Sequence, residues 1–184
     1  MHAMPAHFSL VDAVAAADLQ TFLKRAARLD DAGAARVIAG GGVLAVYVAT
    51  QHPRGLFDPT ATVLGLRTFE TDAAIALDAV VPLRALLDRL ARALEAGIGT
   101  GVGILLPAEV ATAAWAGVAP PRGGWEREDD RDAIELAEAA ANRSDAAAMA
   151  LVDLGFLGLE PVALYRSGAW LRLTTARGHV LAKP

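Results

Sequence analysis

The sequence predicts an α+β fold, in which a mixed or antiparallel sheet is packed by amphipathic helices and ends in a C-terminal β-hairpin. Three patterns support this prediction. Apolar residues recur at helical spacing in two segments, apolar runs bounded by glycine and proline resemble strands, and a Ser-Gly pair separates two strand-like runs near the end of the chain. The 184 residues are enough for one domain or two small ones.

Two segments have the pattern of amphipathic helices. In the first, an apolar residue returns every three or four positions, and Ser9 with Asp12 forms a capping-box-like start. Its apolar face comprises Val11, Ala15, Leu19, Phe22, Ala26 and Leu29. The second begins at Pro82, where proline is tolerated in a helix. Its apolar face comprises Leu83, Leu86, Leu87, Leu90 and Leu94. Further helices are predicted at residues 107–115, 131–142 and 145–157.

Strands are predicted between these helices. Residues 43–49 are apolar at every position, which predicts a central strand covered on both faces. A turn at residues 40–42 precedes it, because three consecutive glycines break regular structure. The other predicted strands are residues 36–39, 62–71, 74–81 and 102–106.

The C-terminal hairpin is predicted to turn at Ser167-Gly168, which places Tyr165 opposite Trp170 and Leu164 opposite Leu171. A third strand, residues 179–182, follows a predicted turn at Arg177-Gly178. The glycine-rich stretch at residues 97–103 suggests a boundary between an α+β region at 1–98 and a helical region with the hairpin at 102–184. The alternative is a single compact domain.

Composition excludes several kinds of chemistry. The chain has no cysteine, so disulfides, thiolate nucleophiles and thiolate metal sites are excluded. Its formal net charge of −4 argues against a general nucleic-acid binder. The longest stretch without a charged residue, 37–53, is broken by glycines, so we expect no membrane span. No secretory signal is visible at the N-terminus, and we expect a cytoplasmic protein.

The reactive side chains are few, and each fits a structural role. The serines Ser9, Ser144 and Ser167 are expected to cap helices or form a turn, and the lysines Lys24 and Lys183 to face solvent. The four histidines lack metal-binding spacing. The glycines of residues 97–103 follow a predicted helix, whereas a dinucleotide-binding loop follows a strand. We therefore expect no catalytic residue, no metal and no cofactor.

Several stretches resemble a family of actinobacterial proteins of unknown function. They are spread over most of the chain: residues 43–49 (VLAVYVA), 62–69 (TVLGLRTF), 114–126 (AWAGVAPPRGGWE) and 174–181 (TTARGHVL). The resemblance implies an actinobacterial source and no particular activity.

Three functions remain open at this stage. The leading hypothesis is a non-catalytic protein that acts through association as a homodimer, since apolar residues make up 54% of the chain. The first alternative is a small-molecule-binding protein or unfamiliar enzyme, because tryptophan and arginine can anchor planar or anionic ligands of unknown identity. Its site would comprise Trp115, Arg122, Trp125, Arg172, Arg177 and His179.

The second alternative is a winged-helix regulator that binds DNA. The predicted order of three helices and a basic hairpin suggests it. However, residues 145–157 carry acids and no Lys or Arg, which would repel phosphate.

Overall fold

The computed structural model describes residues 6–97, 101–110 and 113–184. Within it the chain forms two compact units, each built from two separate stretches of sequence. Unit 1 comprises Met1–Val48 and Arg67–Ala113, and unit 2 comprises Ala49–Leu66 and Ala114–Pro184. The domain ranges expected from the glycine-rich stretch stay a prediction.

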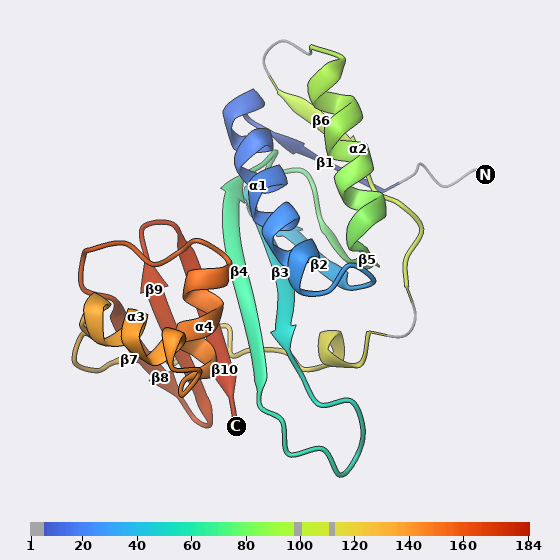
Figure 1. Ribbon diagram of the computed structural model, residues 1–184. Coiled ribbons are helices and arrows are strands. Elements are labelled where there is room, and N and C mark those ends of the chain that lie inside the picture. The colour runs from blue at the N-terminus through green and yellow to red at the C-terminus, as the bar shows by residue number, and fades with distance from the viewer. Residues whose placement is uncertain (1–5, 98–100, 111–112) are drawn as a thin grey trace. The chain divides into compact units, whose positions relative to one another are not determined.

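Unit 1 contains the two long helices, α1 (Ala13–Leu29) and α2 (Leu83–Glu95), which pack against each other (Figure 1). Asp12 is the N-cap of α1, and its Oδ1 accepts a hydrogen bond from the Ala15 amide at 2.8 Å. The predicted cap at Ser9 is therefore wrong. Of the predicted apolar face, Leu19, Phe22 and Ala26 are buried, while Val11 and Leu29 at its two ends are exposed.

The sheets of unit 1 are antiparallel. One follows the order β5 (Leu77–Pro82), β2 (Ala34–Gly40), β3 (Val43–Gln51) and β4 (Thr62–Glu70), and the other pairs β1 (His7–Leu10) with β6 (Val102–Leu105). The turn between β2 and β3 is at Gly41-Gly42, where positive φ values of 59° and 83° suit glycine. Burial alternates along β3, so the strand is not covered on both faces as predicted.

Residues 62–66 of β4 belong to unit 2, and the rest of the strand belongs to unit 1. In unit 2 the strand order of the sheet is β4, β10 (Gly178–Lys183), β9 (Trp170–Thr175), β8 (Ala163–Ser167) and β7 (Glu126–Arg127). Two short helices, α3 (Ala133–Ala141) and α4 (Ala146–Asp153), accompany it (Figure 1). The predicted α+β class with antiparallel strands and a C-terminal hairpin is thus confirmed.

The helix predicted at residues 107–115 is wrong over residues 107–110, and residues 111–112 lie outside the described part of the chain. The Val110 amide instead donates a hydrogen bond to the Val80 carbonyl at 2.8 Å, so this segment runs beside β5. A single 3₁₀ turn, η1 (Ala114–Gly117), follows.

The register of the β8–β9 hairpin differs from the prediction. Ser167 pairs with Trp170, so the turn is Gly168-Ala169, and Tyr165 lies opposite Arg172. The φ of Gly168 is 56°, as the first central position of a type II′ turn requires. The next turn is Ala176-Arg177, one residue before the predicted one. The alternation of faces along both strands is as predicted, because the register shifts by an even number of residues.

The two faces of this sheet have different neighbours. On one face, Val162, Leu173 and Val180 are buried, and Gly178 lies against Phe156, which follows α4. A Cβ at Gly178 would come within 2.6 Å of the Phe156 ring. The opposite face carries Arg172, with buried Trp170 on the same strand.

Candidate functional site

Arg172 on β9 lies between two aromatic rings. Its guanidinium carbon is 4.4 Å from the centroid of Tyr165 and 4.7 Å from that of Trp125. Tyr165 is directly opposite Arg172 across the β8–β9 pair. Arg127 of β7 lies opposite Tyr165 in turn, and Trp125 precedes Arg127 by two residues, so the sheet's alternation brings Trp125 to the same face. We call Trp125, Tyr165 and Arg172 the aromatic–arginine stack.

The stack holds a cation without a carboxylate. In the part of the chain that the structure describes, no acidic side chain lies within ion-pair distance of Arg172, and its buried Nε has no hydrogen-bond partner. Ring faces attract a guanidinium, and they stabilise it further where water is excluded. The indole N–H of Trp125 donates to the Pro121 carbonyl at 3.2 Å, which fixes the ring.

His179 on β10 lies beside this stack. Its Nδ1 shares a hydrogen bond of 3.1 Å with the Thr174 hydroxyl, the residue opposite it on β9. Burial lowers the pKa of His179, and the positive charge of Arg172 lowers it further. The lowered pKa favours the neutral imidazole at pH 7, so Arg172 is the positively charged member of this group of side chains.

The structure brings together three of the six predicted ligand-binding residues. Trp125 and Arg172 are in contact, and His179 is close enough to Arg172 for the guanidinium charge to lower its pKa. Trp115 is buried in η1, Arg122 is exposed, and Arg177 forms an ion pair of 3.8 Å with Glu160; these three are not part of the stack. Sequence reasoning left out Tyr165, which the correct hairpin register would have placed opposite Arg172.

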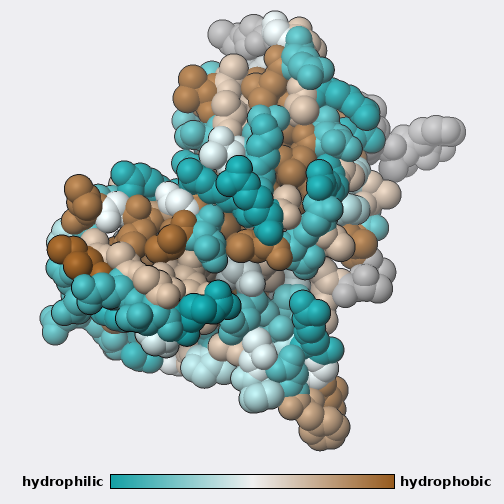
Figure 2. Space-filling model, in the orientation of Figure 1, coloured by the Kyte–Doolittle hydropathy of each residue, from teal (hydrophilic) through white to brown (hydrophobic). Residues whose placement is uncertain are grey.

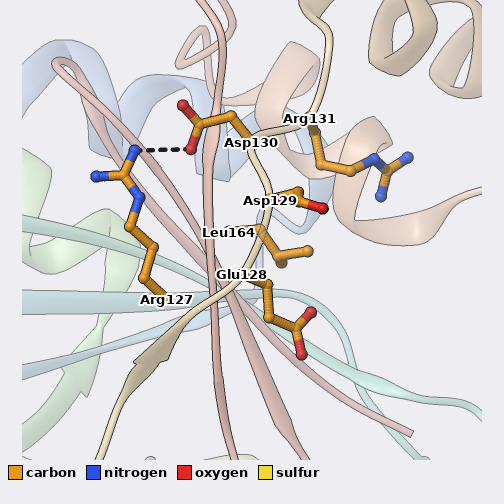
Figure 3. A pocket seen from close by; sticks show the side chains of 6 residues that line it. All are labelled: Arg127, Glu128, Asp129, Asp130, Arg131 and Leu164. Carbon is orange, nitrogen blue, oxygen red and sulfur yellow. Dashed lines mark hydrogen bonds and ion pairs between the residues drawn. The ribbon is translucent and has the colours of Figure 1, made fainter.

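A shallow depression of about 680 Å³ lies along residues 127–131 and Leu164 (Figure 3). Its charges compensate one another. Arg127 bonds Asp130 at 2.8 Å, Arg131 points away from them toward Asp145 at 3.8 Å, and Glu128 bonds Arg166 at 2.6 Å. The depression is therefore a salt-bridged surface, and the acidic cluster at residues 126–132 is largely engaged in these pairs and in capping α3.

The loop between β3 and β4 carries a feature that sequence reasoning missed. Leu56 and Phe57 are adjacent and each is 97% exposed. The loop extends beyond the strand ends in Figure 1. Two large apolar residues inside a segment rich in proline and glycine were the available signal, since such loops are usually polar.

Asp58 braces this loop. Its Oδ2 accepts from the Arg54 amide at 2.8 Å and its Oδ1 from the Thr60 amide at 2.9 Å. The Asp58 amide closes a turn on the Gly55 carbonyl at 3.2 Å. The hydrogen bonds from Thr60, and then that from Arg54, lower the pKa of Asp58 to about 2, so the brace stays ionised at physiological pH. We call the pair Leu56 and Phe57 the apolar tip.

Other site types are not seen in the described ranges. They contain no group of three or more His, Asp or Glu side chains placed to hold a metal ion. None of their helices combines the length and hydrophobicity needed to cross a membrane. The helix order of a winged helix is also not formed, because residues 107–110 are not helical and the hairpin strands are paired with β10 and β7 in a larger sheet.

Two known protein families match parts of this chain. The family described as a domain of unknown function (DUF8010) matches residues 4–117, which is more than half of the chain. This chain belongs to that family. A second domain of unknown function (DUF8185) matches residues 142–184, from the residue after α3 through β10. The expected membership in an uncharacterised family is confirmed, while the actinobacterial source stays a prediction. No curated protein sequence matches this chain.

Solved structures show a fold similar to that of this family member. They include the pol III beta of Caulobacter crescentus (9% identity, TM-score 0.53) and the DNA polymerase III subunit beta of Pseudomonas aeruginosa (14%, 0.52). The Helicobacter pylori beta clamp in complex with carprofen is a third (9%, 0.52). They cover 96%, 100% and 96% of this chain. In the other direction, the chain spans 64%, 68% and 63% of their lengths. At these identities the likeness shows the fold alone.

Proposed function

We propose that this chain is a non-catalytic protein that acts through association with other proteins, and that it forms a homodimer. The supporting observation is its fold, which is similar over 96–100% of the chain to structures described as the beta subunit of DNA polymerase III. A subunit acts within an assembly of chains, and the similar fold supports association with other chains as the function of this protein.

The surface supports this proposal. Leu56 and Phe57 are almost fully exposed although each offers a large apolar side chain. Exposed apolar clusters commonly mark interaction sites. The hydrogen bonds of Asp58 fix the backbone of the loop that carries both side chains before any partner binds, which reduces the entropy cost of binding.

Sedimentation equilibrium of the full chain tests the homodimer. Between about 1 µM and about 100 µM, the range of affinities typical of moderate protein interfaces, the mass should rise from 19.1 kDa toward twice that value. A constant mass of one chain over this range would contradict the homodimer. We also propose a cytoplasmic location, and cell fractionation that finds the protein outside the cytoplasm would contradict it.

A second candidate function is ligand binding at the aromatic–arginine stack. It is supported by the unpaired guanidinium of Arg172 between two rings, with His179 beside it. A small carboxylate or phosphate would supply the missing counter-charge. Titration with acetate and with inorganic phosphate should change the fluorescence of Trp125, and R172Q should abolish the change. An unchanged spectrum with both anions at low ionic strength would rule out this candidate.

A further inference from the structure

Unit 2 holds the three most exposed large apolar side chains in the described part of the chain. Leu56 and Phe57 form the apolar tip, and Leu159, which is 95% exposed, follows α4. Such residues are seldom left in water without a use when they are adjacent or clustered. The tip is also a built structure, since Asp58 fixes it through two hydrogen bonds.

A second apolar surface belongs to the same unit. Ile134 near the start of α3 is 67% exposed and Val152 near the end of α4 is 46% exposed. Together with Leu159 we call them the apolar patch. Hydrophobic residues gather over α3, α4 and the loop that follows α4 in Figure 2.

The patch has an acidic rim and the tip has a basic flank. Each patch residue is followed by an acid: Glu135 after Ile134, Asp153 after Val152, and Glu160 after Leu159. Glu160 also pairs with Arg177 at 3.8 Å, so Glu135 and Asp153 supply most of the rim's negative charge. In contrast, Arg54 with an exposed side chain precedes the tip. Both carboxylate oxygens of Asp58 accept hydrogen bonds from backbone amides of the loop, so Arg54 is the charged side chain beside the tip that can reach a partner's carboxylates.

We propose that the apolar tip of one copy docks on the apolar patch of a second copy. Leu56 and Phe57 then cover Ile134, Val152 and Leu159, while Arg54 faces the acidic rim. Because every copy has both a tip and a patch, a two-fold axis makes the contact twice, as isologous dimers require. The inference rests on the proposed homodimer and names its surface.

The expected area is compatible with a weak but specific dimer. Two copies of the contact bring ten large apolar side chains together, which at roughly 100 Å² each gives about 1,000 Å², the lower end for specific interfaces. The tip and the patch do not cover each other within one copy, because Leu56, Phe57 and Leu159 are at least 95% exposed to solvent there. A second copy supplies what each surface lacks.

Sedimentation equilibrium of matched variants tests this surface. L56S/F57S and I134S/L159S should each raise the dimer dissociation constant at least tenfold, and R54E should raise it by a smaller factor. V14S is the matched control, because Val14 is 71% exposed on α1 of unit 1 and should leave the dimer unchanged. All of these positions are exposed, so circular dichroism should show the wild-type fold in every variant.

Mixing the two double variants separates a direct contact from a general effect. The L56S/F57S copy retains its patch and the I134S/L159S copy retains its tip, so their mixture should recover one of the two contacts and dimerise more strongly than either alone. A wild-type dimer that survives both double variants would overturn this inference and leave the proposed homodimer standing. A monomeric wild type would overturn both, and a mixture no stronger than its components would overturn the tip–patch contact.

Discussion

The helices of the two units differ in length and in what stabilises them. In unit 1, α1 and α2 run for 17 and 13 residues and pack against each other. In unit 2, α3 and α4 have nine and eight residues, and each begins at an aspartate that accepts two backbone amides. Short helices have few internal hydrogen bonds to offset nucleation, so they depend on caps and on packing.

Their helices also differ in charge. Together α1 and α2 carry six basic and three acidic residues, whereas α3 and α4 carry three acids and no base. The most exposed apolar residues accompany the acidic pair. The two units thus share the α+β class but differ in the charge and exposed apolar residues of their helices, and unit 2 carries the surface that we propose for association.

The largest expected effect tests how tightly unit 2 is packed. G178A places a methyl group within 2.6 Å of the Phe156 ring at a φ of 158°, and should lower the free energy of unfolding by about 3 kcal/mol. G103A in unit 1 meets nothing within 4 Å and should change it by less than about 0.5 kcal/mol. Urea denaturation measures both, and equal values would show that the helix-packed face of unit 2 yields easily.

The next effect compares two stacked arginines. R172K removes a planar cation from between two rings and should cost about 1–2 kcal/mol. R67K in unit 1 alters a longer contact with a single ring, at 5.4 Å from the centroid of Phe69, and should cost about 0.5 kcal/mol. If thermal unfolding shows the larger loss for R67K, the stack is not a stabilising element of unit 2.

Helix caps give the third effect. D145A removes the two hydrogen bonds, of 2.9 Å and 3.0 Å, that backbone amides of the eight-residue α4 donate to the Asp145 side chain. The free energy of unfolding should fall by about 1.5 kcal/mol. D12A removes one bond from the 17-residue α1 and should cost about 0.5–1 kcal/mol. Urea denaturation of both variants against D129A, at an exposed position outside the helices, checks the order, and a reversed order would contradict the dependence of short helices on their caps.

The smallest effect concerns pH. The pKa of His179 is lowered in the folded chain, so the unfolded chain binds more protons between the folded pKa and about 6.5. Stability from this residue is therefore complete above about pH 6.5 and decreases as the pH falls from there to the folded pKa. H179Q should flatten the stability profile between pH 7.5 and pH 5.5, and an identical profile in H179Q would contradict the assignment.

Much of the fold could be predicted because it follows local patterns. The spacing of Leu83, Leu86 and Leu90 predicted α2, and the glycines before Val43 predicted the β2–β3 turn. The β8–β9 register could not be predicted correctly, because Ser167 and Gly168 are compatible with two turn positions and only the pairing of Ser167 with Trp170 in the folded sheet distinguishes them.

The candidate site was less predictable because it depends on contacts distant in sequence. The sequence predicted Trp125 and Arg172 as ligand-binding residues, but their stacking depends on the pairing of β7 with β8. A strand of two residues is too short to be recognised from its sequence pattern. The helix expected after Pro107 is absent from residues 107–110, because the Val110 amide donates its hydrogen bond to the Val80 carbonyl of β5. Local helix propensity takes no account of such a distant partner. The apolar tip was overlooked because proline and glycine define its segment only as a loop.

The central claim, that unit 2 mediates association between copies, is tested most directly by cross-linking in a chain without native cysteine. Copies carrying G55C, beside the tip, are mixed with copies carrying E135C, beside the patch, and treated with a short bismaleimide. We predict a cross-linked product of twice the chain mass in this mixture, well above the yield from G55C mixed with G40C, whose label lies in unit 1. Equal yields in the two mixtures would contradict the claim.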